Sequence, residues 1–180
     1  ITISGGTTEI ANQNTPTYGT IEISANAAGL TASVSDFTGT TTLNSALTST
    51  GEHPGIELLN VASSTIRNST MNVIGNVGSR STALFRINSC GNVAGQGCLG
   101  TETPRAITTA VIDNVTGTNG TPGGYGAIIG QDATSSADNQ ITGAHISDAD
   151  ITCTVASNSG HGAMLGYLVG GRITRSKVDA

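Results

Sequence analysis

The sequence repeats itself at intervals of about 35 residues. Gly-Tyr-Gly-Ala-Ile-Ile-Gly at 124–130 recurs 36 residues later as Gly-His-Gly-Ala-Met-Leu-Gly at 160–166. Tyr-Gly-Thr-Ile-Glu-Ile at 18–23 recurs at a spacing of 35 as His-Pro-Gly-Ile-Glu-Leu at 53–58, with a weaker copy at 85–87. Periodic similarity of this kind is typical of a chain built from equivalent units that pack against their neighbours.

A second kind of block follows these segments. Its copies begin near residues 30, 66, 107, 141 and 173, which gives a period of 32 to 41 residues. The copies are short, β-branched and mostly alternating, and Gly, Asn or Asp follows them, so each predicts a strand that ends in a turn. Equivalent strands that recur in order favour coils stacked on one another, with loops of different lengths between them.

The composition favours the same class of fold. The chain has 28 Thr, 18 Ser, 14 Asn and 25 Gly but only 11% charged residues, which disfavours exposed helices. We therefore predict an all-β protein, with residues 1–180 forming a single domain. Its fold is predicted to be a parallel β-helix of about five irregular coils, and the alternative is an antiparallel β-sandwich.

These repeats resemble right-handed parallel β-helix proteins of the pectin-lyase-like type, including the glycine-rich repeats of bacterial surface adhesins. The likeness lies in Gly-Ala-Ile-Ile-Gly, in Gly-Ala-Met-Leu-Gly-Tyr-Leu-Val-Gly-Gly and in the Ile-Thr-x-Ser/Ala blocks. It implies either a structural or adhesive module, or a polysaccharide-binding or polysaccharide-degrading lyase or hydrolase.

Acidic and amide side chains recur after the strand blocks. With the blocks aligned on their first residues, one column contains Asp36, Asn72, Asp113 and Asp179, and Asp148 is displaced from it by one residue. Such a column predicts a turn ladder, because Asp and Asn bond to their own backbone in tight turns. The functional alternatives are a Ca²⁺ site, for which Asp113, Asp148 and Asp150 are the candidates, and a catalytic carboxylate pair. Asp148 and Asp150 are the leading candidates for that pair, because Asp148-Ala149-Asp150 would place both carboxylates on one face of a strand. No cofactor other than Ca²⁺ is expected.

Aromatic residues and histidines occupy matching positions in the first kind of repeat. Tyr18 matches His53, and Tyr125 matches His161, so these four side chains are candidates for a strip on which a sugar could stack. The alternative is that they only cover an edge of the coil. No basic partner for the acidic candidates is identifiable from sequence proximity, which favours a non-catalytic role.

Charge and cysteine usage restrict the partners and the compartment. Seven basic residues are scattered between Arg67 and Lys177, so no nucleic-acid-binding stripe is expected, and no apolar stretch is long enough to insert into a membrane. The glycine-rich loop between Cys90 and Cys98 favours a disulfide over two separate thiols, whereas Cys153 lies in a strand pattern. The sequence thus predicts an extracellular or cell-surface protein.

The two ends of the sequence show no capping segment. Together with the low charge, this predicts end-to-end self-association into a filament, near Ile1, Ile3 and the 173–178 strand. The leading hypothesis is a non-catalytic adhesive or fibre-forming β-solenoid, with a cell-surface glycan as its candidate ligand.

Overall fold

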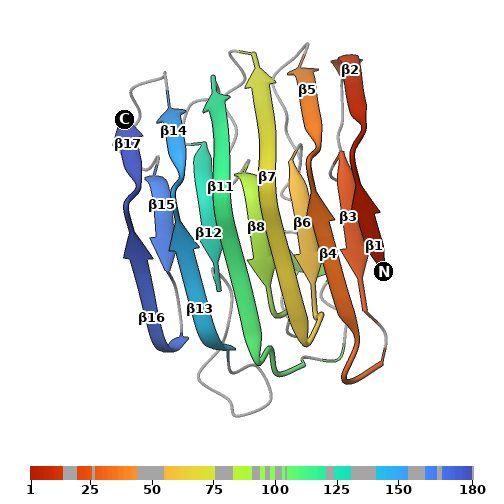
Figure 1. The fold of residues 1–180 in the computed structure, drawn as a ribbon. Coiled ribbons are helices and arrows are strands. Elements are labelled where there is room, and N and C mark those ends of the chain that lie inside the picture. The colour runs from red at the N-terminus through yellow and green to blue at the C-terminus, as the bar shows by residue number, and fades with distance from the viewer. Residues whose placement is uncertain are drawn as a thin grey trace.

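Figure 1 shows the computed structural model of the chain. The structure describes residues 1–13, 20–25, 27–43, 55–75, 83–90, 94–95, 98–99, 103, 105–120, 124–130, 141–153, 161–165 and 168–179. Side chains are described throughout these ranges except at 10–13, 43, 94–95, 98–99, 161–165, 168–169 and 178–179.

All regular elements of the described residues are strands, and most belong to two sheets. Sheet A contains β1 (Thr2–Ser4), β2 (Thr7–Gln13), β4 (Thr31–Ser35), β5 (Thr38–Leu43), β7 (Ser63–Ile74), β11 (Thr109–Asn119), β13 (Ile141–Ser147), β14 (Asp150–Cys153), β16 (Leu168–Thr174) and β17 (Lys177–Asp179). Sheet B contains β3 (Ile21–Ser24), β6 (Ile56–Leu59), β8 (Ala83–Asn88), β12 (Tyr125–Ile129) and β15 (His161–Leu165). A small hairpin joins β9 (Ala94–Gly95) and β10 (Cys98–Leu99).

The chain visits the two sheets alternately, and each visit adds a parallel strand beside the strand of the previous visit (Figure 1). Within sheets A and B every described pairing is parallel. The all-β prediction is therefore confirmed for the described residues, and the alternative of an antiparallel sandwich is wrong. Among the described strands, antiparallel pairing occurs in the β9–β10 hairpin alone.

The core lies between the two sheets, where apolar residues form columns that run from strand to strand. One column on sheet A consists of Ile3, Val34, Ile66, Ile112, Ile146 and Ile173. Its four inner members are fully buried, and Ile56, Leu58 and Ile87 of sheet B belong to the same cluster. Each such buried side chain contributes about 1.5–3 kcal/mol relative to an exposed one, so the stacked columns are a main source of stability.

This register corrects the alignment of the strand blocks. Val34, not Leu30, pairs with Ile66, and Ile173 pairs with Ile146 rather than with Ile141. The spacings along this column are 31, 32, 46, 34 and 27 residues. The predicted starts near 107 and 141 do pair, as Ile107 with Ile141. The predicted starts near 30, 66 and 173 do not lie in register with Ile107 and Ile141.

Sheet A bends at one position on every visit of the chain. The bend residues have left-handed backbones, with φ of 73° at Gly5, 56° at Asp36, 49° at Asn68, 49° at Asn114, 50° at Asp148 and 45° at Arg175. Asn and Asp adopt this conformation more readily than other non-glycine residues, which explains their use at four of the six positions. The bend separates β1 from β2, β4 from β5, β13 from β14 and β16 from β17, whereas β7 and β11 continue through it.

Candidate functional site

The outer face of sheet A carries rows of polar side chains, because positions that alternate with the buried column point away from the core. The first row consists of Thr2, Ser33, Thr65, Val111, His145 and Arg172. The second row consists of Ser4, Ser35, Arg67, Asp113, Ser147 and Thr174. In both rows the residues on β1 and β4 carry hydroxyl groups, and ionisable side chains occur only on strands that follow these in the sequence.

The bend residues form a hydrogen-bonded ladder beside the second row. Asn114 Nδ2 donates to Asn68 Oδ1 over 3.0 Å, and Asn68 Nδ2 donates to Asp36 Oδ1 over 3.2 Å. Hydrogen bonds from Ser35 and Asn68 hold the pKa of Asp36 below its usual value. The carboxylate and amides at these bends thus bond to one another from strand to strand.

The ladder differs from the column that the sequence predicted. Asp36 and Asp148 do lie at bends, but Asp113 directly precedes the bend residue Asn114. Asn72 and Asp179 share another row, through Thr118 and Thr152. Asn72 Oδ1 there accepts a hydrogen bond from Thr118 N over 3.1 Å. The predicted column is therefore wrong at Asn72, Asp113 and Asp179.

Asp148 and Asp150, the leading acid/base candidates, each face a cation of the next strand. Arg175 Nε and Nη2 donate to the two Asp148 carboxylate oxygens over 2.7 and 2.5 Å, and this hydrogen bonding lowers the pKa of Asp148. Lys177 Nζ lies 3.9 Å from Asp150 Oδ1, and both side chains are more than 60% exposed, so this pair contributes little. Asp148 lies at the bend rather than within a strand, contrary to the sequence prediction.

Asp113, the remaining metal candidate, accepts a 2.5 Å hydrogen bond from Ser147 Oγ on the neighbouring strand. His145 Nε2 lies 2.9 Å from Thr174 Oγ1, so neighbouring polar groups on this face are linked in pairs. Within the described ranges, no three His, Cys, Asp or Glu side chains lie close enough together to hold a metal ion. The structure does not bring Asp113, Asp148 and Asp150 together.

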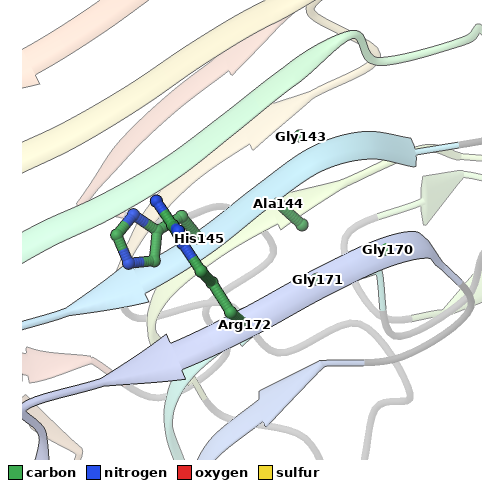
Figure 2. Close-up of a pocket in the computed structure, with 6 residues that line it drawn as sticks. All are labelled: Gly143, Ala144, His145, Gly170, Gly171 and Arg172. Atoms are coloured by element: carbon green, nitrogen blue, oxygen red, sulfur yellow. The ribbon is translucent and has the colours of Figure 1, made fainter.

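A shallow depression opens at the C-terminal end of this face, between β13 and β16. Its volume is about 400 Å³, and it is lined by Gly143, Ala144, His145, Gly170, Gly171 and Arg172. Figure 2 shows the His145 and Arg172 side chains on one side of the two strands, with Ala144 on the other. Sequence reasoning missed this site, although two glycines directly before an arginine are a signal for a bare backbone beside a cation.

The two described members of the candidate sugar strip, Tyr125 and His161, lie on sheet B. Tyr125 and His161 pair with each other across β12 and β15, so their predicted equivalence is confirmed. Tyr125 is half-buried, and its carbonyl accepts a hydrogen bond from Asn119 Nδ2 over 2.9 Å. Tyr18, His53 and the His161 side chain lie outside the described residues.

A buried ion pair on sheet B was not anticipated. Arg86 Nη1 lies 3.0 Å from Glu57 Oε1, and both side chains are completely buried. Glu57 and Arg86 also pair in the sheet register, so the two charges lie directly beside each other on neighbouring strands. Their burial makes this pair inaccessible to a ligand.

The cysteines fall into two environments. Cys90 is buried and does not carry a free thiol, whereas Cys153 does. Burial raises the pKa of the Cys153 thiol, which makes it a poor nucleophile. The Cys98 side chain lies outside the described residues, so the Cys90–Cys98 disulfide stays a prediction.

Comparison of the chain with protein-family models, with curated protein sequences and with solved structures gave no match. The described residues contain no helix that is long and apolar enough to cross a membrane.

Proposed function

We propose that the chain is a parallel β-helix of about five coils that acts as a non-catalytic structural or adhesive segment of an extracellular or cell-surface protein. The observation that carries the proposal is how the polar groups on the outer face are used. The carboxylates and amides of the bend bond to the equivalent residues of neighbouring strands, as Asn68 does to Asp36 and Arg175 does to Asp148. These bonds connect one coil to the next instead of leaving a shared cluster of acids for catalysis.

The competing function is a polysaccharide lyase or hydrolase. It would need an acid and a base on either side of one bound sugar. Asp148 accepts hydrogen bonds from Arg175, and the exposed Asp150 lies beside Lys177, so each carboxylate interacts with a different cation. This arrangement supports the structural function over the enzymatic one.

Enzyme assays separate the two functions. Incubation of the protein with neutral and acidic polysaccharides, with detection of new reducing ends and of unsaturated products, should give no activity. Activity that is lost in Asp148→Asn or Asp150→Asn, while the circular dichroism spectrum is unchanged, would overturn the structural proposal in favour of an enzyme.

We also propose that copies of this 180-residue chain associate end to end. The outer strands of sheet A expose apolar side chains, with Ile1 74% and Ile173 43% exposed. Residues 1–30 contain two acidic residues, Glu9 and Glu22, and no basic residue, whereas residues 168–180 at the opposite edge contain Arg172, Arg175 and Lys177 and one acidic residue, Asp179. Opposite charge and exposed apolar surface at the two edges favour a head-to-tail contact.

Sedimentation velocity at increasing protein concentration tests this association. We expect oligomers that shorten in high salt and in Ile3→Lys, because Ile3 belongs to the outermost strand. Thr65→Lys is the matched control, since Thr65 lies on an inner strand and should leave the association unchanged. A single monomeric species at all concentrations, or an equal effect of both variants, would contradict the proposal.

A further inference from the structure

Among the described residues, the side chains of Arg67 and Arg172 on the outer face have no hydrogen-bond or ion-pair partner, and of these two Arg172 lines the depression. Arg175 and Lys177, on the same visit of the chain to sheet A, lie beside Asp148 and Asp150. Within the described ranges, no side-chain hydrogen bond or ion pair involves the Arg172 guanidinium, and Arg172 is exposed. A guanidinium presents several donors in a planar fork, so Arg172 keeps its full capacity to bind an anion.

The depression beside Arg172 exists because glycines form its floor. Gly143 and Gly170 have left-handed backbones, with φ of 60° and 68°. A Cβ placed at Gly170 would meet no atom within 4 Å, whereas one placed at Gly143 would lie 2.9 Å from the Thr108 carbonyl oxygen. The space beside Gly170 is therefore open, and the depression's volume of about 400 Å³ lies in the range of small-molecule sites. A ligand the size of one sugar or one amino acid could lie against the bare strands.

We propose that this depression binds a carboxylate carried by a ligand of that size. The Arg172 guanidinium would bind the carboxylate through bidentate hydrogen bonds, and the His145 ring beside it would contact the rest of the ligand (Figure 2). Arg175 engages Asp148, and Ser147 donates to Asp113, so these nearby acids have partners other than Arg172. They still repel a second negative charge, which favours a single carboxylate over a phosphate dianion.

The test is a ¹⁵N-edited NMR titration of the purified chain, at a concentration where sedimentation gives one species. The probes are D-glucuronate and N-acetyl-L-alanine, which present one carboxylate on a sugar and on an amino acid, with D-glucose and inorganic phosphate for comparison. We expect saturable shifts of the amides of 143–145 and 170–172 with at least one carboxylate, weaker binding of phosphate and none of glucose. The carboxylate that binds more tightly identifies the source of the ligand.

Variants link the binding to the two side chains. Arg172→Gln should weaken carboxylate binding at least tenfold, and Arg172→Lys should weaken it less, because lysine keeps the charge but loses the fork. His145→Gln tests the second contact. Arg67→Gln is the matched control, since Arg67 is exposed on the same face but does not line the depression.

The proposal fails if neither carboxylate shifts these amides, if glucose binds equally well, or if Arg67→Gln weakens binding as much as Arg172→Gln. It does not depend on the absence of catalysis or on end-to-end association, so either of those proposals can fail separately.

Discussion

The ladder at the bend of sheet A predicts a reversal in how two asparagines of one strand respond to alanine and glycine. Asn68 and Asn72 both lie in β7, but Asn68 has a φ of 49° and Asn72 an ordinary strand backbone. At Asn68 we expect alanine to destabilise the protein more than glycine does. At Asn72 we expect the opposite order.

The magnitudes follow from the contacts of each residue. Replacing Asn68 removes two exposed hydrogen bonds, to Asp36 and from Asn114, worth about 0.5 kcal/mol each at the low end of the usual range. Alanine adds about 1–2 kcal/mol for a left-handed backbone, which gives about 2–3 kcal/mol in all. Glycine avoids that cost but adds about 0.5–1 kcal/mol of backbone entropy, which gives about 1.5–2 kcal/mol.

Asn72 provides the matched control. It accepts one hydrogen bond, from Thr118 N, so alanine should cost about 0.5–1 kcal/mol. Glycine should cost about 0.5–1 kcal/mol more than alanine, because the strand backbone gains nothing from the freedom of glycine.

Urea denaturation followed by circular dichroism measures the four variants, and the order within each pair is the readout. If alanine is tolerated better than glycine at both positions, the backbone conformation of Asn68 is not what selects asparagine there. If all four variants match the parent, the ladder contributes nothing to stability.

Three further outcomes follow from the structure. Arg175 lowers the pKa of Asp148 below 3.8 in the folded protein, so the stability that the ionised Asp148 carboxylate provides is complete at neutral pH and is lost as the pH falls from 3.8 through that lowered pKa. The difference in unfolding free energy between the parent and Arg175→Gln should therefore vanish at such acidic pH. Arg86→Met should lower the unfolding free energy in urea by about 3–5 kcal/mol, because buried Glu57 loses its arginine. The double variant Glu57→Leu/Arg86→Met should recover most of that loss. If the single and the double variant are equally destabilised, the pairing is contradicted. Alkylation without reduction should modify one thiol per chain, at Cys153, and only after denaturation; rapid labelling of the native protein would contradict its burial.

The strands of sheet B were predictable because their repeats carry distinctive residues. Ile-Glu-Ile, Ile-Glu-Leu and Phe-Arg-Ile lie in register on β3, β6 and β8, as their sequence similarity predicted. The glycine-flanked copies on β12 and β15 are in register as well. A motif with a charge or a glycine at a fixed place can be aligned in only one way.

The blocks of sheet A lack such a marker, and their predicted register was wrong. Their pattern of apolar and polar residues alternates with a period of two, so a shift by one residue exchanges the buried and exposed faces and is easily detected. A shift by four residues, such as the one that aligned Leu30 with Ile66, leaves every residue on its proper face. The misalignments of Ile107 and Ile141 are odd, by five residues. Ile107 and Ile112 are nevertheless both buried, because the backbone is irregular between them, where Thr108 N and Thr109 N both donate to Ala62 O. Alternation alone therefore does not fix the register of sheet A.

The depression could not be predicted from the pattern of side chains, because backbone conformation creates it. His145 and Arg172 are 27 residues apart and meet only because β13 and β16 pair in one particular register. Gly143 and Gly170 are skipped in that pairing, while the residues on either side of them align. Once the register of sheet A was misaligned, this juxtaposition was hidden.

The bend supplies the register information that alternation lacks. A left-handed residue stacked on an extended one would break the hydrogen bonds of the parallel ladder, so only strands whose bends coincide can pair along their whole length. The loops can then vary, and spacings from 27 to 46 residues are compatible with one straight column of bends. Arg175 is the exception in residue type, since arginine gains no local hydrogen bond that favours a left-handed backbone. Its two hydrogen bonds to Asp148 form a bidentate pair with the bend residue of the neighbouring strand, so the ladder of bends continues to β16 and β17 through a charge pair instead of amides.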